Sequence, residues 1–393
     1  MPQPSSSASA APPTVLIVGS GLFGAAVAER CASETDCRVV VVEKRPHVGG
    51  NSYSSPDPAT GIEVHRYGSH IFHTDREAVW RYVNRFGEFN DYRHTVWARH
   101  NGGTYSLPIN LATINQFFGT EMGPEEARAL ITRQAAEAGI AAPRNMEEKA
   151  VSMMGRPLYE AFIEGYTTKQ WGTSPRDLPA AIIERLPVRF TYDNRYFDDP
   201  WQGIPVRGYG QLVRRMLDHR RIELHLNTDY FEARERLPRH DVLVFTGPLD
   251  RFFEYRSGAL GWRTLRFEWE TPECADYQGT SVINYVDAAV PFTRVHEFRH
   301  FVADCPCRDR TVIAREFSEA ARRGEDPYYP VRGARDMEVL GQYQREAARL
   351  GPRVLFGGRL GGYTYLDMDD AIHQAFECFE RIRECLKGRA PAS

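Results

Sequence analysis

Three glycines near the start of the sequence have the spacing of a dinucleotide-binding turn. Gly19, Gly21 and Gly24 follow an apolar run at residues 15–18 and open a helical stretch at residues 22–33. In a strand–turn–helix unit, the first glycine permits the tight turn, the second lets the backbone approach a pyrophosphate, and the third lets the helix pack on the strand. The N-terminus of the helix then offers free N–H groups and a partial positive charge to the phosphates.

An acidic residue ends the second predicted strand. Residues 39–42 are four valines, which predict a buried strand, and Glu43 follows them. A carboxylate at this place, roughly 20 residues after the glycines, is expected to accept hydrogen bonds from ribose hydroxyls. A glycine-rich turn without a ligand is the competing interpretation. The agreement of strand, helix, second strand and acid favours the dinucleotide site.

The glycines that follow favour a flavin. Gly49 and Gly50 come just after the acidic strand end, and residues 357–362 are again glycine-rich and lead into a helix at about 368–386. A second glycine pair at this place is typical of FAD-binding proteins. No second glycine turn with its own strand and acid is visible for a nicotinamide. FAD alone is therefore predicted, with either an external reductant or a role without net redox change.

Aromatic residues at helical spacing could bind a planar base. Phe162, Tyr166 and Lys169 fall near one face of a predicted helix, and Trp171 ends it. These rings could stack on a base, with Thr167 as a hydrogen-bond partner. Taken alone, however, aromatics at this spacing are more typical of a core stripe.

Arginines and histidines offer weaker signals. An arginine fork matches phosphate oxygens, but sequence position alone does not select Arg185 or Arg294 among 49 basic residues. His65, His70 and His73 lie close together in the sequence without the spacing of a zinc site, so no metal is predicted.

The elements that must position these residues change in character along the chain. The first strands indicate a parallel, doubly wound sheet, with further strands at 241–245 and 353–356. Helical spacing dominates at residues 111–118, 124–138, 146–153 and 157–169. Alternating runs at residues 264–270, 280–286, 292–298 and 311–317 indicate an antiparallel sheet.

The predicted fold class is α/β: a Rossmann-like FAD-binding domain with a helical insert domain and an antiparallel β-sheet domain. Residues 1–13 are expected to form a disordered tail. The FAD-binding domain is expected to be discontinuous, at residues 14–100, 207–250 and 330–388. The helical substrate or lid domain is expected at residues 101–185. The antiparallel sheet domain is expected at residues 186–206 and 251–329.

Composition narrows the function classes. The 393 residues carry a net charge of -3, which does not favour a nucleic-acid partner. No apolar run is long enough to insert into a membrane. Seven cysteines without a CxxC spacing fit free thiols in a cytoplasmic protein. The oligomeric state, including a homo-oligomer, stays open.

Nine motifs in one order, from about residue 14 to about 387, resemble the bacterial UDP-galactopyranose mutase family. They are GSGLFG, EKRPHVGGN, YGSHIFHT, SLPINLATINQFFG, GRPLYEAFIEGYTTKQWG, RLPVRFTYDNRYF, TRVHEF, PYYP and GGRLGGYTYLDMD. The resemblance departs at Ser69, where many relatives carry proline or alanine. Since serine is small, no loss of function is expected there. Arg66, nearby, could influence which sugar is accepted, including a 2-acetamido sugar.

The resemblance implies an isomerase, a flavoprotein that interconverts UDP-galactopyranose and UDP-galactofuranose for cell-wall and glycan biosynthesis. FAD would act in its reduced form, with flavin N5 attacking the anomeric carbon as UDP leaves. A sugar–flavin iminium would let the ring reclose with no net redox change. Two alternatives remain: an FAD-dependent amine or phytoene-type oxidase, and a flavin-binding module without enzymatic activity.

The resemblance also implies roles for individual residues. The residues implied in catalysis are Arg185 on a mobile loop, Arg294, which would grip the substrate diphosphate from the other side, and His70 and His73 beside the flavin. Those implied in substrate binding are Asn101, Phe162, Thr167, Trp171, Tyr196, Asn284, Tyr329 and Tyr365. Those that would hold FAD are Gly19, Gly21, Phe23, Gly24, Glu43, Lys44, Gly50, Asn51, His70, Arg359, Asp367 and Met368.

Overall fold

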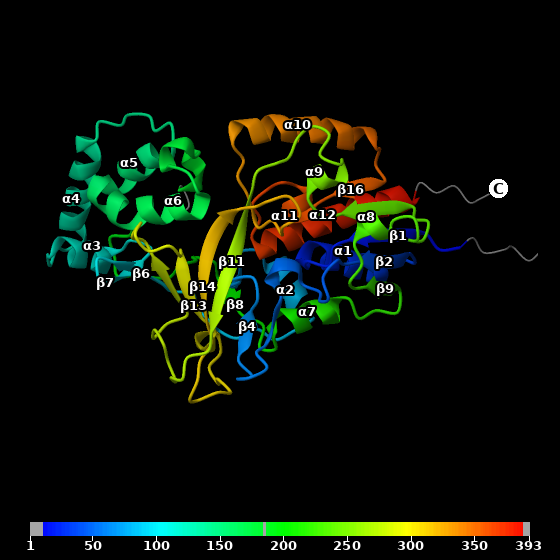
Figure 1. Cartoon of the computed structure of the whole chain (residues 1–393), viewed down its shortest axis with the longest axis horizontal. Coiled ribbons are helices and arrows are strands. Elements are labelled where there is room, and N and C mark those ends of the chain that lie inside the picture. The colour runs from blue at the N-terminus through cyan, green and yellow to red at the C-terminus, as the bar shows by residue number, and fades with distance from the viewer. Residues whose placement is uncertain (1–10, 184–185, 388–393) are drawn as a thin grey trace, which may run out of the picture.

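The computed structural model describes residues 11–183 and 186–387. Its first layer is a five-stranded parallel sheet, seen at the right of Figure 1. In spatial order the strands are β16 (Val354–Phe356), β10 (Val242–Phe245), β1 (Thr14–Val18), β2 (Arg38–Val42) and β9 (Ile222–His225). The sheet brings together strands from three distant parts of the chain. The predicted Rossmann-like arrangement is confirmed.

Helices cover both faces of this sheet. On one face lie α1 (Leu22–Glu34), α7 (Gly208–Met216) and α12 (Met368–Lys387), with α1 in contact with both of the others. The other face packs against α8 (Tyr230–Ala233) and α9 (Leu249–Phe252). The valines of β2 are therefore buried on both sides, which explains why this strand is apolar throughout.

A seven-stranded sheet forms the second layer, and its long strands β11 and β14 stand in the middle of Figure 1. In spatial order the strands are β15 (Tyr329–Pro330), β11 (Trp262–Glu270), β14 (Ile313–Ala320), β13 (Arg294–Glu297), β12 (Val282–Tyr285), β6 (Val96–His100) and β7 (Gly103–Leu107). The sheet is mixed rather than purely antiparallel, because β6 pairs with β12 in parallel.

Strands β6 and β7 differ from the domain boundaries predicted from the sequence. The sequence placed β6 in the FAD-binding segment and β7 in the helical segment, whereas backbone pairing adds both to the second sheet. The pattern of β6 does not identify its partner β12, because pairing across almost 200 residues is decided by tertiary structure. Strand β7 then joins the same sheet through a tight hairpin with β6, closed by Asn101 and Gly102, both at positive φ. Residues 186–206, expected in the same sheet, contribute only β8 (Trp201–Gly203), which pairs with β5 (Phe72–Thr74) in a separate two-stranded sheet.

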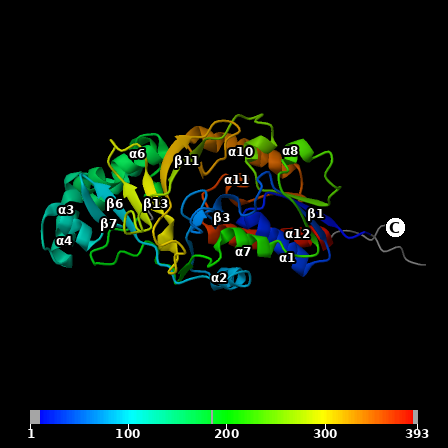
Figure 2. The ribbon, with the colours of Figure 1, turned by 60° about the horizontal axis from the view of Figure 1, so that its bottom comes forward.

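A group of helices lies at the far end of the second sheet, at the left of Figures 1 and 2. It comprises α3 (Leu111–Phe118), α4 (Pro124–Glu137), α5 (Met146–Tyr159), a π-helical turn (Glu160–Glu164) and α6 (Gly165–Trp171). Helix α3 matches its predicted bounds because both ends are coded locally. Asn110 caps its first turn, accepting from the backbone N–H groups of Ala112 and Thr113, and Gly119 ends it in the left-handed conformation. Helix α5 is kinked at Gly155, whose φ is 76°.

The remaining elements connect the layers. The helices are α2 (Glu77–Asn84), α10 (Ala334–Arg349) and α11 (Gly358–Gly361), and the 3-10 turns are Gly50–Ser52, Pro175–Asp177, Ala180–Ile182 and Phe298–Phe301. Strands β3 (Ser54–Pro56) and β4 (Glu63–His65) pair with each other. Every helix in the described part of the chain is too short or too polar to span a lipid bilayer.

Candidate cofactor and substrate site

A cavity of about 260 Å³ opens where β1, β2 and β10 end. We call it the cofactor cavity. It is lined by all twelve residues that the sequence proposed for FAD: Gly19, Gly21, Phe23, Gly24, Glu43, Lys44, Gly50, Asn51, His70, Arg359, Asp367 and Met368. The carboxyl ends of parallel strands are where ligands bind in open α/β sheets.

The glycines at its floor have the conformation that a bound dinucleotide requires. Gly19 has a φ of +101°, and a Cβ on Gly24 would lie 2.1 Å from the carbonyl oxygen of Gly19. A Cβ on Gly50 would lie 3.1 Å from the Cα of Gly21, so two glycine segments meet here without side chains. No side chain caps the N-terminus of α1 at Gly21, which leaves its N–H groups for a phosphate. This geometry fits FAD.

Glu43 joins the two sides of this turn. One of its carboxylate oxygens accepts from the backbone N–H and the hydroxyl of Ser20, both at 2.9 Å, and the other accepts from the backbone N–H of Arg45 at 3.0 Å. A carboxylate offers about four acceptor positions. Three are occupied, so one remains for a ribose hydroxyl.

An ionic contact that the sequence did not predict closes one side of the cavity. Asp326 pairs with Lys44 and, at 2.7 Å, with Arg45, whose guanidinium also donates to Asn51 at 2.8 Å. Burial alone would raise the pKa of Asp326, but Arg45 and Lys44 lower it, so the carboxylate stays charged. The sequence shows Asp326 only as one acid in a polar turn, and its partners lie more than 280 residues away.

His70 is a neutral base at the wall of the cavity. Burial lowers its pKa to about 4, despite the opposing effect of the Gly68 carbonyl. Its Nδ1 lies 2.7 Å from that carbonyl oxygen, which only accepts, so the ring proton is on Nδ1. The Nε2 lone pair is left as the available base.

His73 lies elsewhere. Its Nδ1 is 2.6 Å from the carboxylate of Asp199, and its ring stacks on Phe197 at a centroid distance of 3.6 Å. It does not line the cofactor cavity. Of the two histidines assigned to the flavin from the sequence, the structure brings only His70 there.

The second sheet presents a row of polar side chains across three strands. Asn284, Arg294 and Glu316 are register partners on β12, β13 and β14, so they project from the same face. We call these three the cross-strand row. Arg294 pairs with Glu316 at 3.3 Å and donates to the hydroxyl of Tyr166, while its side chain remains 26% exposed.

Two features of this row indicate an anionic, polar ligand. Burial alone would raise the pKa of Glu316, but Arg294 and His296 lower it to about 2, so the carboxylate holds Arg294 in its charged form. The buried side-chain oxygen of Asn284 has no hydrogen-bond partner within the protein. Such an orphaned acceptor is expected to find its donor on a ligand. The sequence analysis missed Glu316, which stands in β14 between Arg315 and Phe317 and has no local pattern that separates it from surface acids.

The helical residues divide between core and site. Phe162 is 1% exposed and packs with the rings of His100, Tyr105 and Phe117, as the core-stripe interpretation expects. Thr167 is also buried, while Trp171 is half-buried at the end of α6.

Lys169 fixes α6 to the second sheet. Its ammonium donates to four backbone carbonyls, those of Tyr285, Asp287, Val290 and Phe292, at 2.6–3.1 Å. Burial lowers its pKa to about 8. The loop between β12 and β13, which leads into Arg294, is thereby tied to the helix that carries Trp171.

Two tyrosines and Arg359 connect the cofactor cavity to the rest of the site. Tyr329 and Tyr365 stack at a centroid distance of 5.9 Å, and the guanidinium of Arg359 lies over both rings, at 5.4 and 5.0 Å. Burial raises the pKa of Tyr329, so its hydroxyl remains a donor at neutral pH.

The other predicted substrate residues are more scattered. The ring of Tyr196 packs edge-on against His94. Asn101 is exposed in a turn, where its backbone N–H donates to Asp287 at 3.0 Å. Arg185 lies outside the described residues.

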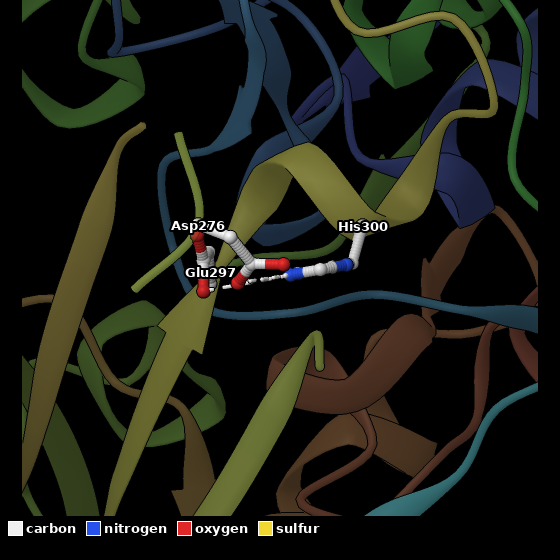
Figure 3. A group of neighbouring side chains, drawn as sticks. All are labelled: Asp276, Glu297 and His300. Carbon is white, nitrogen blue, oxygen red and sulfur yellow. Dashed lines mark hydrogen bonds and ion pairs between the residues drawn. The ribbon is translucent and has the colours of Figure 1, made fainter. Parts of the chain in front are cut away.

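A group of three potential metal ligands is held by ordinary hydrogen bonds. Asp276, Glu297 and His300 place one ligand atom each within 4.8 Å of one another (Figure 3). Glu297 already accepts from the backbone N–H groups of Tyr277 and Gln278, at 2.9 and 2.8 Å, and His300 lies 3.1 Å from Asp276. The group thus ties an exposed turn to the end of β13, and no ion is needed to explain it.

Comparison with known proteins gives one consistent result. A family model described as UDP-galactopyranose mutase matches residues 161–365, and a model described as NAD(P)-binding Rossmann-like domain matches residues 17–86. A probable UDP-galactopyranose mutase from Klebsiella pneumoniae is 43% identical over 92% of this chain and 93% of its own length. A dTDP-fucopyranose mutase from Escherichia coli is 42% identical over 93% of this chain and 97% of its own length.

The fold has a counterpart among solved structures. A crystal structure of reduced UDP-galactopyranose mutase superposes with a TM-score of 0.72 over 95% of this chain and 94% of that chain, at 15% sequence identity. At this identity the likeness shows the fold alone.

Proposed function

Because this chain belongs to the UDP-galactopyranose mutase family, we propose that it interconverts the pyranose and furanose forms of a nucleotide-linked galactose. It is a flavin-dependent isomerase whose cofactor is FAD, and the reaction involves no net redox change. The observation that carries the residue assignments is the cofactor cavity, where twelve residues from four parts of the chain meet around one glycine turn.

FAD, when bound and reduced, supplies an electron-rich nitrogen that can hold the sugar's anomeric carbon while the nucleoside diphosphate is detached. The protein's part is to bind, orient and exclude water. The glycine turn and α1 bind the cofactor pyrophosphate, Glu43 accepts from its ribose, and Asp326 holds Lys44 and Arg45 across the opening.

The cross-strand row binds the substrate in this proposal. Arg294, kept charged and oriented by Glu316, grips the substrate diphosphate, and Asn284 accepts a hydrogen bond from a substrate hydroxyl. Arg185 is proposed to grip the same diphosphate from the other side, and Tyr196, Tyr329 and Tyr365 to donate hydroxyls to it.

The helical group binds the base in this proposal. Trp171 and Thr167 contact the uracil, Phe162 supports them from the core, and Asn101 contacts the substrate from its turn. At the cofactor, His70 offers the lone pair of Nε2 for a proton.

A second substrate has specific support. The dTDP-fucopyranose mutase is as similar to this chain as the probable UDP-galactopyranose mutase, at 42% and 43% identity over comparable lengths. Fucose lacks the 6-hydroxyl of galactose, and dTDP lacks the ribose 2′-hydroxyl and carries a methyl group on the base. The diphosphate, which Arg294 is proposed to grip, is common to both.

An anaerobic assay separates these alternatives. Dithionite-reduced holoprotein is incubated with UDP-galactofuranose, and separately with dTDP-fucofuranose, and the products are resolved by chromatography. We expect UDP-galactopyranose to form with the higher kcat/KM. A higher kcat/KM for the dTDP sugar would transfer the assignment to the second substrate. Turnover by oxidised protein in air, with release of peroxide, would favour the oxidase alternative and contradict the proposal.

We place the enzyme in the cytoplasm, where it would supply furanose sugars for glycan assembly. All seven cysteines are free thiols, and several are buried in the core of the first layer. Such cysteines suit a reducing compartment.

A further inference from the structure

We propose that Ser69 and His296 are positioning residues that join the turn carrying His70 to the arginine that grips the diphosphate. Ser69 contacts His296 at 2.5 Å, and His296 contacts Glu316 at 2.9 Å. Glu316 in turn pairs with Arg294 at 3.3 Å. This inference rests on the proposed function for the role of Arg294, but the hydrogen-bond chain itself can be tested without it.

The direction of each hydrogen bond in the chain is determined. Glu316 is ionised, because its pKa is lowered to about 2, so it only accepts. Burial lowers the pKa of His296, so its ring is neutral at pH 7 and carries one proton. That proton must be on Nε2, which faces Glu316. Nδ1 is then an acceptor, and the hydroxyl of Ser69 is its donor.

The two central residues of this hydrogen-bond chain are enclosed by the protein, while Ser69 is half-buried at its end. His296 is 0% exposed and Glu316 is 2% exposed. The rings of Phe267 and Phe298 lie about His296, with centroid distances of 6.1 Å in both cases. Water therefore has little access to replace a lost partner, and removing the Ser69 hydroxyl leaves a buried acceptor unsatisfied.

At one end, the chain holds the turn that presents His70 to the cofactor cavity. Gly68, with a φ of +93°, lies against the second sheet, since a Cβ there would be 3.3 Å from Phe267 and 3.4 Å from the carboxylate of Glu316. His70 bonds to the Gly68 carbonyl and, through its backbone N–H, to the ring of His65 at 3.0 Å. Ser69 lies between Gly68 and His70 and is the residue whose side chain bonds to the sheet.

At the other end, the chain shares a carboxylate with Arg294. Glu316 accepts from Thr293 at 3.1 Å through the oxygen that faces Arg294, and from His296 through the other oxygen. His296 thus fixes the rotation of the carboxylate that orients the guanidinium. A change at Ser69 is expected to reach Arg294 by this route, although the two side chains are not in contact.

The first test measures UDP binding to oxidised, FAD-loaded protein by calorimetry. Ser69→Ala should weaken UDP binding by about 3- to 10-fold, the effect of one buried hydrogen bond. Ser69→Thr, which keeps the hydroxyl, should restore most of the affinity. Ser55→Ala is the matched control, because Ser55 is a half-buried serine whose hydroxyl bonds to Arg66 outside the chain. It should leave UDP affinity unchanged.

The second test uses His296→Phe, which keeps the aromatic volume. If the hydrogen-bond chain transmits the effect, Ser69→Ala should not weaken UDP binding further in the His296→Phe background. Equal losses in both backgrounds would overturn the proposal, as would an unchanged affinity in Ser69→Ala alone.

A spectroscopic test separates this inference from the proposed function. In nitrogen-15 histidine-labelled protein, the Nδ1 signal of His296, assigned by its loss in His296→Phe, should have the shift of a hydrogen-bonded acceptor. It should move in Ser69→Ala and stay in place in Ser55→Ala. If the signal moves but UDP does not bind, the proposed function is contradicted while the hydrogen bond between Ser69 and His296 is supported. If the signal does not move, that hydrogen bond is not present and the inference is contradicted.

Discussion

The guanidinium of Arg294 is oriented by the protein itself, without a ligand. Its register partner Glu316 sits on the neighbouring strand, and the two form an ion pair whose carboxylate is almost fully buried. A guanidinium held in this way needs little rearrangement to meet a diphosphate, and such preorganisation is a large part of catalysis by charge stabilisation.

Replacing Arg294 tests this at the level of one side chain. Arg294→Ala should lower kcat by about 100- to 1,000-fold, since loss of one preorganised charge contact costs about 3–4 kcal/mol in the transition state. The measurement is kcat and KM of the reduced enzyme with its sugar nucleotide. Arg266→Ala is the control, because Arg266 is a surface arginine of the same sheet paired with Glu268 and Glu319. Unchanged turnover in Arg294→Ala would contradict the assigned role.

The strand–turn–helix unit of β1 and α1 is proposed to bind FAD through backbone N–H groups. What matters at its glycines is therefore whether the backbone leaves room for a side chain. Gly24 lies where the first turn of α1 crosses the carbonyl of Gly19, and a methyl group there would be 2.1 Å from that oxygen. Because the clash is with backbone, it cannot be relieved by rotating a side chain.

Gly24→Ala should therefore separate α1 from β1 and reduce cofactor retention. We expect purified Gly24→Ala protein to hold less than half the FAD of the wild type, measured as the ratio of flavin to protein absorbance. Its unfolding temperature should also be lower than that of the wild type, since overpacking typically reduces the free energy of unfolding by about 1–3 kcal/mol. Gly341→Ala, in α10, is the matched control: its nearest contact is the end of Arg345 at 3.5 Å, so it should bind FAD normally. Full FAD content in Gly24→Ala would show that the close approach is not required.

Acid sensitivity is a property of the whole molecule. Burial lowers the pKa of His70 to about 4 and that of His94 to about 3, from an ordinary value of 6.5. Both rings are neutral in the folded protein, whereas the unfolded chain takes up protons below pH 6.5. The stability that depends on the neutral rings is complete above pH 6.5 and is lost as the pH falls toward 4.

We therefore expect the free energy of unfolding to decrease between pH 7 and pH 5, by about 2 kcal/mol for each such histidine. The measurement is urea unfolding of the oxidised holoprotein at a series of pH values. His94→Phe should reduce the slope, since this ring no longer titrates in the unfolded chain. An identical slope in His94→Phe would contradict the account.

The sequence by itself determined the features that depend on near neighbours. The glycine turn, the four-valine strand and Glu43 follow from backbone conformation and spacing, and the structure has them in that arrangement. Helix α3 is equally local, since Asn110 and Gly119 define its two ends. Motif resemblance extended this to the family and to twelve of the residues that line the cofactor cavity.

Only the tertiary structure decided which distant segments meet. Four features join residues more than 100 positions apart, or strands whose register nothing local fixes: the pairing of β6 with β12, the salt bridge from Asp326, the alignment of Arg294 with Asn284 and Glu316, and the contact between Ser69 and His296. Periodicity tells which face a residue takes on its own strand but not which strand lies beside it. Pairing is chosen by the total burial and hydrogen bonding of the folded chain, and no short window of sequence contains that sum.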